Sequence, residues 1–348
     1  MNRFDKKCMQ LAIELAQKGN GPVSPNPPVG AVLSRNGEIV GAGYHQKFGE
    51  AHAEVNALQN CDGEGGTLYI TLEPCNHRGK TPPCVDTITD RKIDRVVVGS
   101  LDPNPQMQGH SIEILRTQGI EVEMGFLEDQ TDELIRFYTH WMKTGRPYVT
   151  VKLALSADGF IAKPDGTSKW ISSEESRMEV HRMRAEYDAV MVGTNTVLTD
   201  NPALTVRDAE GRNPSRVVID RHRHVPQTAK VFSLNGTDIF YFSRAKRDDL
   251  PNHIQQLTFE DDESTLPTIL EELGRNDQTS LLVEGGAAIA HSFVQDGLCE
   301  EVIIYRSPKK LKNGIPFDES KLSDLGFSLF EEAEAGVDRK IIYRRSYV

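Results

Sequence analysis

The chain has 348 residues, more than one hydrophobic core usually serves, so two domains are expected. Its formal net charge of −11 argues against nucleic acid as the main partner, because such binding leaves a basic footprint, whereas a phosphorylated small molecule needs only a local basic pocket. The sequence has neither an apolar run of about 18 residues nor a signal-peptide core, which predicts a cytoplasmic protein without a membrane partner.

Helices and strands alternate through the first 145 residues. Apolar residues at helical spacing predict a helix over 3–18, and Asn36-Gly37 is a strong hairpin signal between strands over 29–33 and 38–42. Further helices are expected from residue 51, from residue 83, and over 110–118 and 129–142, with strands over 67–72, 95–99 and 120–124. This alternation predicts a mixed sheet covered by helices on its faces.

Four residues of this half indicate a catalytic zinc site: His52, Glu54, Cys75 and Cys84. A catalytic zinc takes three protein ligands and leaves its fourth position to water. H-x-E followed by P-C-x-x-C is the signature of zinc deaminases, in which the glutamate is the general acid and base. The two cysteines are separated here by eight residues instead of two. The five cysteines of the chain, an odd and sparse set, fit metal ligands and free thiols better than disulfides.

The expected helices place the histidine and both cysteines at or near helix N-termini. The partial positive charge there favours the thiolate that binds zinc. A structural zinc site is the alternative, and it requires a fourth protein ligand, which His45 or His77 could supply. That alternative leaves Glu54 without a role, so the pattern favours a catalytic site.

The strings HAEVNAL and TLEPCNHRGKTPPC resemble the cytidine-deaminase-like superfamily, and within it the deaminase domain of the bifunctional riboflavin-biosynthesis deaminase/reductase family. The eight-residue cysteine spacing is typical of that branch. The resemblance implies an α/β/α sandwich and a phosphorylated ribosylamino-pyrimidinone substrate. It implies Zn²⁺ on His52, Cys75 and Cys84, with Glu54 as the catalytic proton shuttle. The substrate contacts that it implies are Asn26, His45, Ala53, His77 and Lys80.

A short polar break over 143–147 predicts a domain boundary, with domains over 1–145 and 146–348. In the second half, strands are expected over 148–155, 160–162, 189–192, 216–219, 238–242, 280–283, 302–305 and 340–343, and helices over 173–184 and 266–273. No G-x-G-x-x-G fingerprint follows the first strand. The strand at 280–283 instead leads into Gly285-Gly286 and a helix, where backbone amides can approach a phosphate.

The strings KLALSADGFIA, SKWIS, GTNTVLTDNPALTVR and VEGG resemble the reductase domain of the same family. This resemblance implies a dihydrofolate-reductase-like α/β fold and NADPH-dependent reduction of the ribosyl group to ribityl. The implied substrate contacts are Ser168, Arg184, Leu204, Arg207 and Glu284. The implied cofactor contacts are Ala154, Trp170, Thr196, Asp200, Gly286, Ala287, Ala288, Ile289, Ala290, His291 and Ser292.

Several of these side chains suit their implied roles. Arg184 and Arg207 can hold a phosphate with bidentate forks, and a salt bridge is the alternative for each. Trp170 offers an apolar face to the cofactor or, alternatively, packs in the core. Lys152 is a further candidate near the sugar, and no residue is an obvious proton donor.

The cluster Arg221-His222-Arg223-His224 lies where the family contacts cofactor, and it either binds the 2′-phosphate of NADPH or forms a solvated loop. Two other functions compete with the bifunctional enzyme. One is a deaminase acting on nucleic acid, which the acidic balance opposes, and the other is a zinc-stabilised protein that only senses NADPH. Self-association into a homo-oligomer is expected, at contacts that the sequence does not locate.

Overall fold

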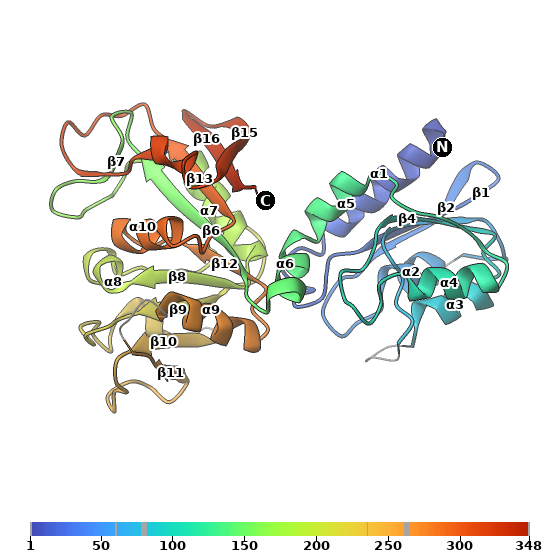
Figure 1. Cartoon of the computed structure of the whole chain (residues 1–348), viewed down its shortest axis with the longest axis horizontal. Coiled ribbons are helices and arrows are strands. Elements are labelled where there is room, and N and C mark those ends of the chain that lie inside the picture. Colours follow the sequence, from blue (N-terminus) through green and yellow to red (C-terminus); the bar gives the residue numbers. More distant parts are fainter. Residues whose placement is uncertain (1, 60, 78–81, 235, 261–264, 347–348) are drawn as a thin grey trace. The chain divides into compact units, whose positions relative to one another are not determined.

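The computed structural model describes residues 2–59, 61–77, 82–234, 236–260 and 265–346. The chain forms two compact units, Met1–Gly145 and Arg146–Val348 (Figure 1). None of the helices within the described residues is long and apolar enough to span a membrane.

The first unit is built on a five-stranded sheet in the order β2-β1-β3-β4-β5. Its strands are β1 (Gly30–Arg35), β2 (Glu38–Tyr44), β3 (Thr67–Leu72), β4 (Arg95–Ser100) and β5 (Glu121–Glu123). β1 runs antiparallel to both β2 and β3, whereas β3, β4 and β5 are parallel. The predicted hairpin is present, because Asn36 and Gly37 both have the positive φ angles that its tight turn requires.

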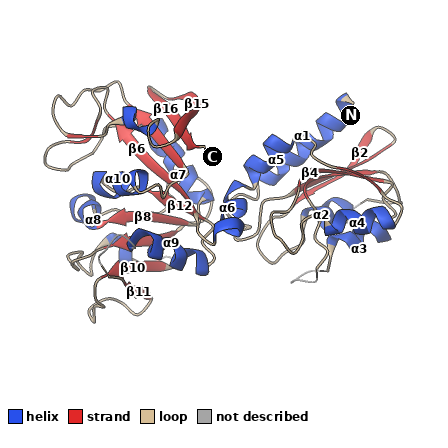
Figure 2. Ribbon diagram, viewed as in Figure 1, coloured by secondary structure: helices blue, strands red, loops and turns tan. Residues whose placement is uncertain are grey.

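Helices cover both faces of this sheet, which gives three layers (Figure 2). α1 (Arg3–Gln17) packs on Val32, Tyr69 and Val97, and α5 (Glu128–Leu134) contacts both α1 and β4. The alternate strand residues point the other way, into a core with α2 (Ala53–Leu58), α3 (Cys84–Asp90) and α4 (His110–Thr117). The predicted α/β/α sandwich is therefore confirmed.

Two details of the first-unit prediction are wrong. The helix expected over 129–142 is divided at Ile135, which ends α5 and precedes α6 (Arg136–Thr144). The helix expected from residue 51 begins at Ala53, so His52 is its N-cap and lies outside the helix.

The second unit is built on a nine-stranded sheet in the order β11-β10-β9-β8-β12-β6-β13-β16-β15. The strands from β11 to β13 are parallel, and β16 and β15 extend the sheet with antiparallel pairings. Their bounds are β6 (Tyr148–Leu155), β8 (Ala189–Gly193), β9 (Ser215–Ile219), β10 (Ile239–Ser243), β11 (Ile254–Thr258), β12 (Ser280–Val283), β13 (Glu301–Arg306), β15 (Phe327–Ala335) and β16 (Asp338–Arg345). β7 (Phe160–Ala162) and β14 (Ile315–Pro316) form a separate small pair.

Helices also cover this sheet on both faces. α9 (Thr265–Arg275) and α10 (Ala287–Gln295) contribute Ile269, Leu273 and Phe293 to the larger core cluster. α7 (Glu174–Glu186) packs Val180 against Ile303 on the opposite face. The short α8 (Thr194–Asp200) follows β8 directly, and single 3-10 turns lie at Lys230–Phe232 and Glu319–Leu322.

The two-domain α/β prediction is confirmed, but several elements of the second unit were not predicted. These are the strands β11, β14 and β15, the helix α8 and the two 3-10 turns. The strand expected over 340–343 is not the last of the sheet, because β15 pairs with β16 beyond it. Parallel strands place their carboxyl ends on one edge of a sheet, so the residues that follow β6, β8, β9 and β12 share an edge.

Candidate active sites

Three ligand-type side chains meet in the first unit at the ends of successive elements. His52 caps α2, Cys75 follows β3, and Cys84 is the first residue of α3. The His52 Nδ1 atom lies 3.2 Å from the Cys84 sulfur and 3.5 Å from the Cys75 sulfur, and all three donor atoms lie within 4.8 Å of one another. In the described part of the chain this group has only these three members, so no fourth ligand of a structural site joins it.

The donor set fits a tetrahedral zinc. Zinc–nitrogen and zinc–sulfur bonds of standard length place neighbouring ligand atoms about 3.5 Å apart, close to the separations observed here. The Cys84 thiol and the His52 ring lower the pKa of Cys75 to about 4, so this sulfur already favours the thiolate. Cys75 lies outside the helices, but its sulfur accepts the backbone N–H of Cys84, the first residue of α3, at 3.3 Å, which puts it near a helix N-terminus.

Glu54 lies in the first turn of α2, beside this donor set, and is only 3% exposed. Burial raises its pKa to about 7, and the nearby Cys75 thiolate adds to that rise. A carboxyl group in such a setting can both accept and release a proton near neutral pH, which is what a proton shuttle requires.

Two of the predicted substrate contacts lie side by side next to the donor set. The Asn26 Nδ2 atom lies 3.3 Å from His45 Nε2, and His45 Nδ1 lies 3.1 Å from the carbonyl oxygen of Ala51. Burial lowers the pKa of His45, whose ring is 5.2 Å from the ring of His52. Ala53, the first residue of α2, is fully buried behind them.

A cavity of about 210 Å³ opens onto these groups. Asn26, His45, His52, Glu54, Cys75 and His77 all line it, so most of the predicted first-unit site residues share one cavity. Lys80, predicted to contact the phosphate, lies outside the described residues. The sequence prediction missed Asp102 and Tyr138, which also line the cavity and are joined by a 3.3 Å hydrogen bond from the tyrosine hydroxyl. A carboxylate two residues beyond a parallel strand was the signal that could have identified Asp102.

A largely buried group of charges, with side chains 8% to 18% exposed, forms the centre of the second site. Glu284, which follows β12, accepts two hydrogen bonds from the Arg184 guanidinium, at 2.5 and 2.8 Å, and lies 3.9 Å from Lys152 Nζ. Burial alone would raise the pKa of Glu284, but the two cations outweigh it and hold the pKa at about 2. Burial lowers the pKa of Lys152.

This arrangement changes the role expected of Arg184. Its remaining Nη1 atom donates to the carbonyl oxygen of Thr205 at 3.2 Å. All three nitrogen atoms of the guanidinium, which was predicted to bind a phosphate, therefore donate to protein acceptors. Leu204 is buried with φ of 56°, and the neighbouring backbone N–H of Arg207 donates to His181 Nδ1 at 3.3 Å. The Arg207 side chain is exposed. The sequence prediction missed His181, whose position becomes informative only once the fold is known.

The predicted cofactor contacts gather at the carboxyl edge of the sheet. Thr196 in α8 accepts the backbone N–H of Gly286 at 2.9 Å, which joins α8 to the start of α10. Lys169 Nζ lies 3.4 Å from the carboxylate of Asp200, which joins the segment of Ser168 and Trp170 to α8. Trp170 is 63% exposed, so the alternative that it packs in the core is excluded.

The remaining predicted contacts extend this edge. Ala154 lies near the end of β6, and the helix α10 carries the last six of the predicted cofactor positions, Ala287, Ala288, Ile289, Ala290, His291 and Ser292. Of these, Ala290 is fully buried in the core, so its side chain is not available to a ligand.

Comparison with known proteins assigns both units of the chain to known families of domains. A family model described as the RibD C-terminal domain matches residues 147–328, and one described as the cytidine and deoxycytidylate deaminase zinc-binding region matches residues 2–100. The riboflavin biosynthesis protein RibD of Aquifex aeolicus is 40% identical over 96% of this chain and 94% of its own length. The chain belongs to the RibD family.

Solved structures agree with this assignment. A deaminase/reductase from Thermotoga maritima superposes with a TM-score of 0.90 at 38% identity, covering 99% of both chains. A RibD from Acinetobacter baumannii gives the same TM-score at 35% identity, also over 99% of both chains. As a RibD family member, the chain is a bifunctional riboflavin-biosynthesis enzyme, a hydrolase and an oxidoreductase, with Zn²⁺ and NADPH as its cofactors.

Proposed function

We propose that the first unit deaminates a diaminopyrimidinone that carries a ribosylamino 5′-phosphate, and that the second unit reduces the ribosyl group of the product to ribityl. The Thermotoga maritima relative, a diaminohydroxyphosphoribosylaminopyrimidine deaminase/5-amino-6-(5-phosphoribosylamino)uracil reductase, supports this choice of substrates. The observation that carries the proposal is the buried Glu54 beside the donor set of His52, Cys75 and Cys84, at a cavity that Glu54, His52 and Cys75 line.

In the deaminase site, the chain's own residues position the ring and move protons. Bound zinc supplies Lewis acidity that makes water reactive near neutral pH. Glu54 takes a proton from the attacking water and passes protons to the ring nitrogen and to the departing ammonia. Asn26, His45 and the Ala53 backbone hold the pyrimidine, and His77 with Lys80 binds the phosphate. The net change replaces an exocyclic amino group by a carbonyl oxygen.

In the reductase site, bound NADPH would supply the hydride that reduces C1′ of the sugar. The opened sugar then needs a proton, and we assign this proton to Lys152, a partly buried ammonium whose pKa burial lowers. Glu284 holds that ammonium in place and is itself fixed by Arg184, and these residues, with Ser168 and Leu204, shape the sugar site. The exposed Arg207 binds the 5′-phosphate from the loop that His181 fixes. Trp170, Thr196, Asp200 and α10 bind the cofactor.

One assay tests both steps. The purified full-length chain is loaded with zinc and given the diaminopyrimidinone ribosylamino 5′-phosphate, with and without NADPH, and the products are identified by mass. We expect exchange of an NH group for oxygen without NADPH, and the further gain of two hydrogens with it. NADPH oxidation that does not depend on a ribosylamino phosphate would contradict the proposed order.

The competing functions give different results. A deaminase acting on nucleic acid would release ammonia from single-stranded RNA or DNA, and a zinc-stabilised sensor would bind NADPH without releasing ammonia from any substrate. Self-association into a homo-oligomer stays a prediction, which sedimentation of the full-length chain tests.

A further inference from the structure

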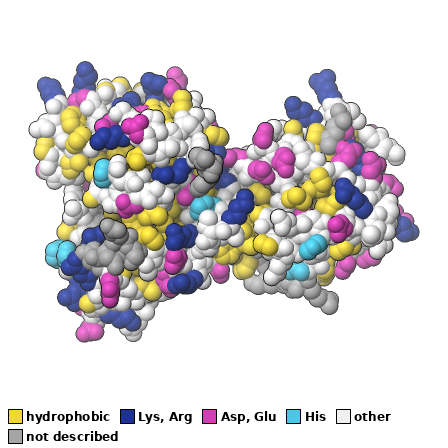
Figure 3. Space-filling model, viewed as in Figure 1, with side chains coloured by type: hydrophobic (Ala, Val, Ile, Leu, Met, Phe, Trp, Pro, Cys, Tyr) yellow, Lys and Arg dark blue, Asp and Glu magenta, His cyan; other side chains and the backbone are white. Residues whose placement is uncertain are grey.

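The segment 204–208, called here the phosphate loop, presents the arginine that is proposed to bind the substrate phosphate. Leu204 is buried in a core cluster and anchors the start of the loop, whereas the side chains of Arg207 and Asp208 are exposed. The chain has a net charge of −11, and basic and acidic side chains are interspersed on the face of the second unit that Figure 3 shows. Because the overall charge does not favour a phosphate, the exact position of a local cation matters more.

Two side chains of α7, one helical turn apart, hold the phosphate loop. The backbone N–H of Arg207 donates to His181 Nδ1 at 3.3 Å, and Arg184 Nη1 donates to the carbonyl oxygen of Thr205 at 3.2 Å. Residues three positions apart share one face of a helix, so both contacts reach the same loop. His181 is only 5% exposed and bonds the residue that carries the proposed phosphate-binding side chain. Its ring therefore fixes the backbone from which that side chain extends.

The contact between His181 and Arg207 depends on the protonation state of the ring. A backbone N–H can only donate, so the Nδ1 atom of His181 must be unprotonated in order to accept it. The hydrogen of the neutral ring then lies on Nε2, which is 3.2 Å from the carboxylate of Asp208. A second proton, on Nδ1, would turn the acceptor into a donor that faces the N–H of Arg207. The contact can therefore form only while the ring is neutral.

The charged groups around His181 keep its ring neutral near pH 7. Arg184 on the same helix, Arg207 and Asp208 on the loop, and Glu284 after β12 all act on it. Burial and the two arginines lower the pKa of His181, and the two carboxylates oppose them without restoring the usual value of 6.5. The ring should therefore take up its second proton only in mildly acidic solution.

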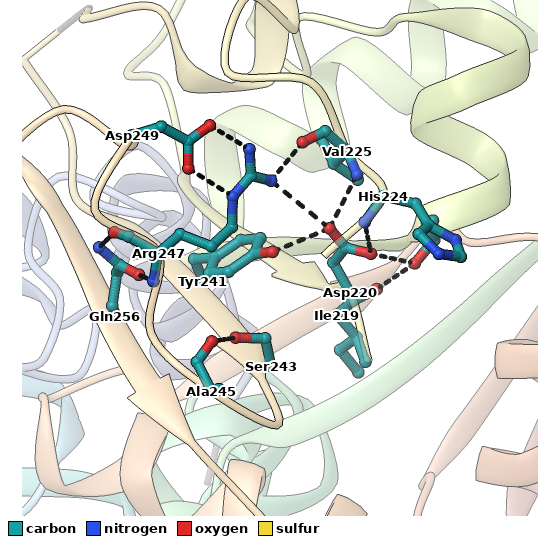
Figure 4. A network of polar contacts seen from close by, with 11 residues as sticks. Ile219, Asp220, His224, Val225, Tyr241, Ser243, Ala245, Arg247, Asp249 and Gln256 are labelled. Atoms are coloured by element: carbon teal, nitrogen blue, oxygen red, sulfur yellow. Dashed lines mark hydrogen bonds and ion pairs between the residues drawn. The ribbon is translucent and has the colours of Figure 1, made fainter. Parts of the chain in front are cut away.

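The loop that follows β9 is held in a different way. The buried carboxylate of Asp220 accepts the backbone N–H groups of His224 at 3.0 Å and Val225 at 2.8 Å, and Asp249 accepts two hydrogen bonds from the Arg247 guanidinium at 2.9 and 2.5 Å (Figure 4). Every acceptor that Figure 4 draws is an oxygen atom. The phosphate loop differs because one of its acceptors is a ring nitrogen that titrates near physiological pH.

We propose that neutral His181 is a positioning residue for the reductase. By accepting the N–H of Arg207 it holds the phosphate loop in the conformation that binds the 5′-phosphate, and its protonation releases the loop and weakens substrate binding. The inference rests on the proposed phosphate contact of Arg207 and adds to it a second residue and a dependence on pH. Because the loop binds the substrate and takes no part in the chemical step, the KM of the reduction should rise as the pH falls, while kcat changes little.

The test measures the KM for separately supplied deaminated substrate, with saturating NADPH and the full-length, zinc-loaded chain. His181→Gln is the main variant, because a glutamine oxygen can accept the Arg207 N–H at every pH and its amide can donate to Asp208. The substrate phosphate also titrates, near about pH 6, but it does so for both proteins, so the ratio of their KM values isolates the histidine.

We expect the KM of the unaltered chain, divided by that of His181→Gln, to rise at least about threefold between about pH 8 and about pH 5. The midpoint of this rise should coincide with the midpoint of the His181 ring in an NMR titration, where the signal is assigned by its absence from the variant. A residue that only stabilises the fold would not link the two midpoints.

Asp208→Asn is a second variant that alters an exposed side chain, so it does not put folding at risk. It removes a negative charge that raises the pKa of His181, and the rise in KM should therefore move to lower pH. Asp249→Asn is the matched control. It neutralises a carboxylate of similar exposure, 49% against 59%, in the network of Figure 4, and it should leave the pH profile unchanged.

Arg207→Gln separates this inference from the proposed function. It keeps the backbone N–H but removes the guanidinium, so it should raise KM at every pH and abolish the effect of His181→Gln. If Arg207→Gln does raise KM, parallel KM profiles for the unaltered chain and His181→Gln, or a pH effect confined to kcat, would overturn the inference alone. An unchanged KM in Arg207→Gln would instead refute the phosphate contact in the proposed function, and the inference with it.

Discussion

The two candidate sites differ in how the chain assembles them. The deaminase site draws its donor atoms from neighbouring element ends, and the donor atoms of His52 and Cys84, which lie 3.2 Å apart, come from positions 32 residues apart. The reductase site pairs Arg184 with Glu284, which are 100 positions apart and come from a helix and from the end of a strand. The first is a local motif that a metal completes, and the second is a long-range ion cluster that the fold completes.

Charge compensation separates the sites further. In the first unit, the thiol and imidazole groups form a set whose negative charge calls for a cation, and zinc supplies it. In the second unit, a carboxylate lies between two cations of the protein itself. Removal of the metal should therefore abolish the activity of the first site. The stability and activity of the second site should instead depend on the charged side chains that form it.

Among the substitutions that should leave zinc bound, Glu54→Gln is expected to have the largest effect on the rate of ammonia release. Removing the proton shuttle should lower the rate of ammonia release by about 10³-fold, because general acid–base groups contribute about 10² to 10⁴. Zinc content, measured by atomic absorption, should stay the same. Reduction of separately supplied deaminated substrate should also continue, which would show that the two sites are independent.

Glu50→Gln is the control for this variant. Glu50 lines the same cavity but is exposed and belongs to no ligand set, so ammonia release should change little. A Glu54→Gln protein that keeps most of its activity would remove the proposed proton shuttle from the mechanism.

Cys84→Ser should abolish zinc retention and, with it, ammonia release. The donor set would lose one of its two sulfurs, and the remaining pair cannot supply three protein ligands. Calorimetric binding of NADPH should persist, since the second unit has its own core. Cys61→Ser is the control: this buried thiol donates to the carbonyl oxygens of Val40 and Ala57, which a hydroxyl can also do, and zinc should be retained.

The contrast between local and long-range sites also decides what the sequence could predict. The strands β3, β6 and β12 were predicted to the residue, because each is an apolar run between clear breaks. β15 was missed, since FSLFEEAEA lies at the sheet edge with most of its side chains exposed, and its apolar alternation is interrupted at Phe330-Glu331, where the pairing register shifts. The zinc ligands could be predicted from a local motif of residue types and its resemblance to a family, but no local motif reveals that Glu284 accepts two hydrogen bonds from the Arg184 guanidinium.

Glu284→Gln is expected to destabilise the second unit by about 3 kcal/mol, because removing one partner of a buried ion pair leaves the other charge uncompensated. Chemical denaturation followed by hydrogen exchange of β6 and β12 amides would measure this change within the second unit. Glu271→Gln provides the control, since it breaks the 2.6 Å pair with Arg146, whose two side chains are 33% and 43% exposed, and it should have little effect. Equal effects of the two substitutions would show that the buried cluster contributes no more than a surface pair.

The smallest expected effect is the pH dependence of the stability difference between the unaltered chain and Glu284→Gln. Arg184 and Lys152 hold the pKa of Glu284 at about 2, against a usual 4.5, so the ionised carboxylate stabilises the folded state at every pH above 4.5. As the pH falls from 4.5 toward 2, the unfolded chain binds this proton first, and about 3 kcal/mol of stability is lost at 1.36 kcal/mol per pH unit. A protonated glutamate and a glutamine are both neutral and similar in shape. The stability of the unaltered chain should therefore approach that of Glu284→Gln near pH 2, and hydrogen exchange that shows a constant difference across this window would contradict the assignment of the shift to Glu284.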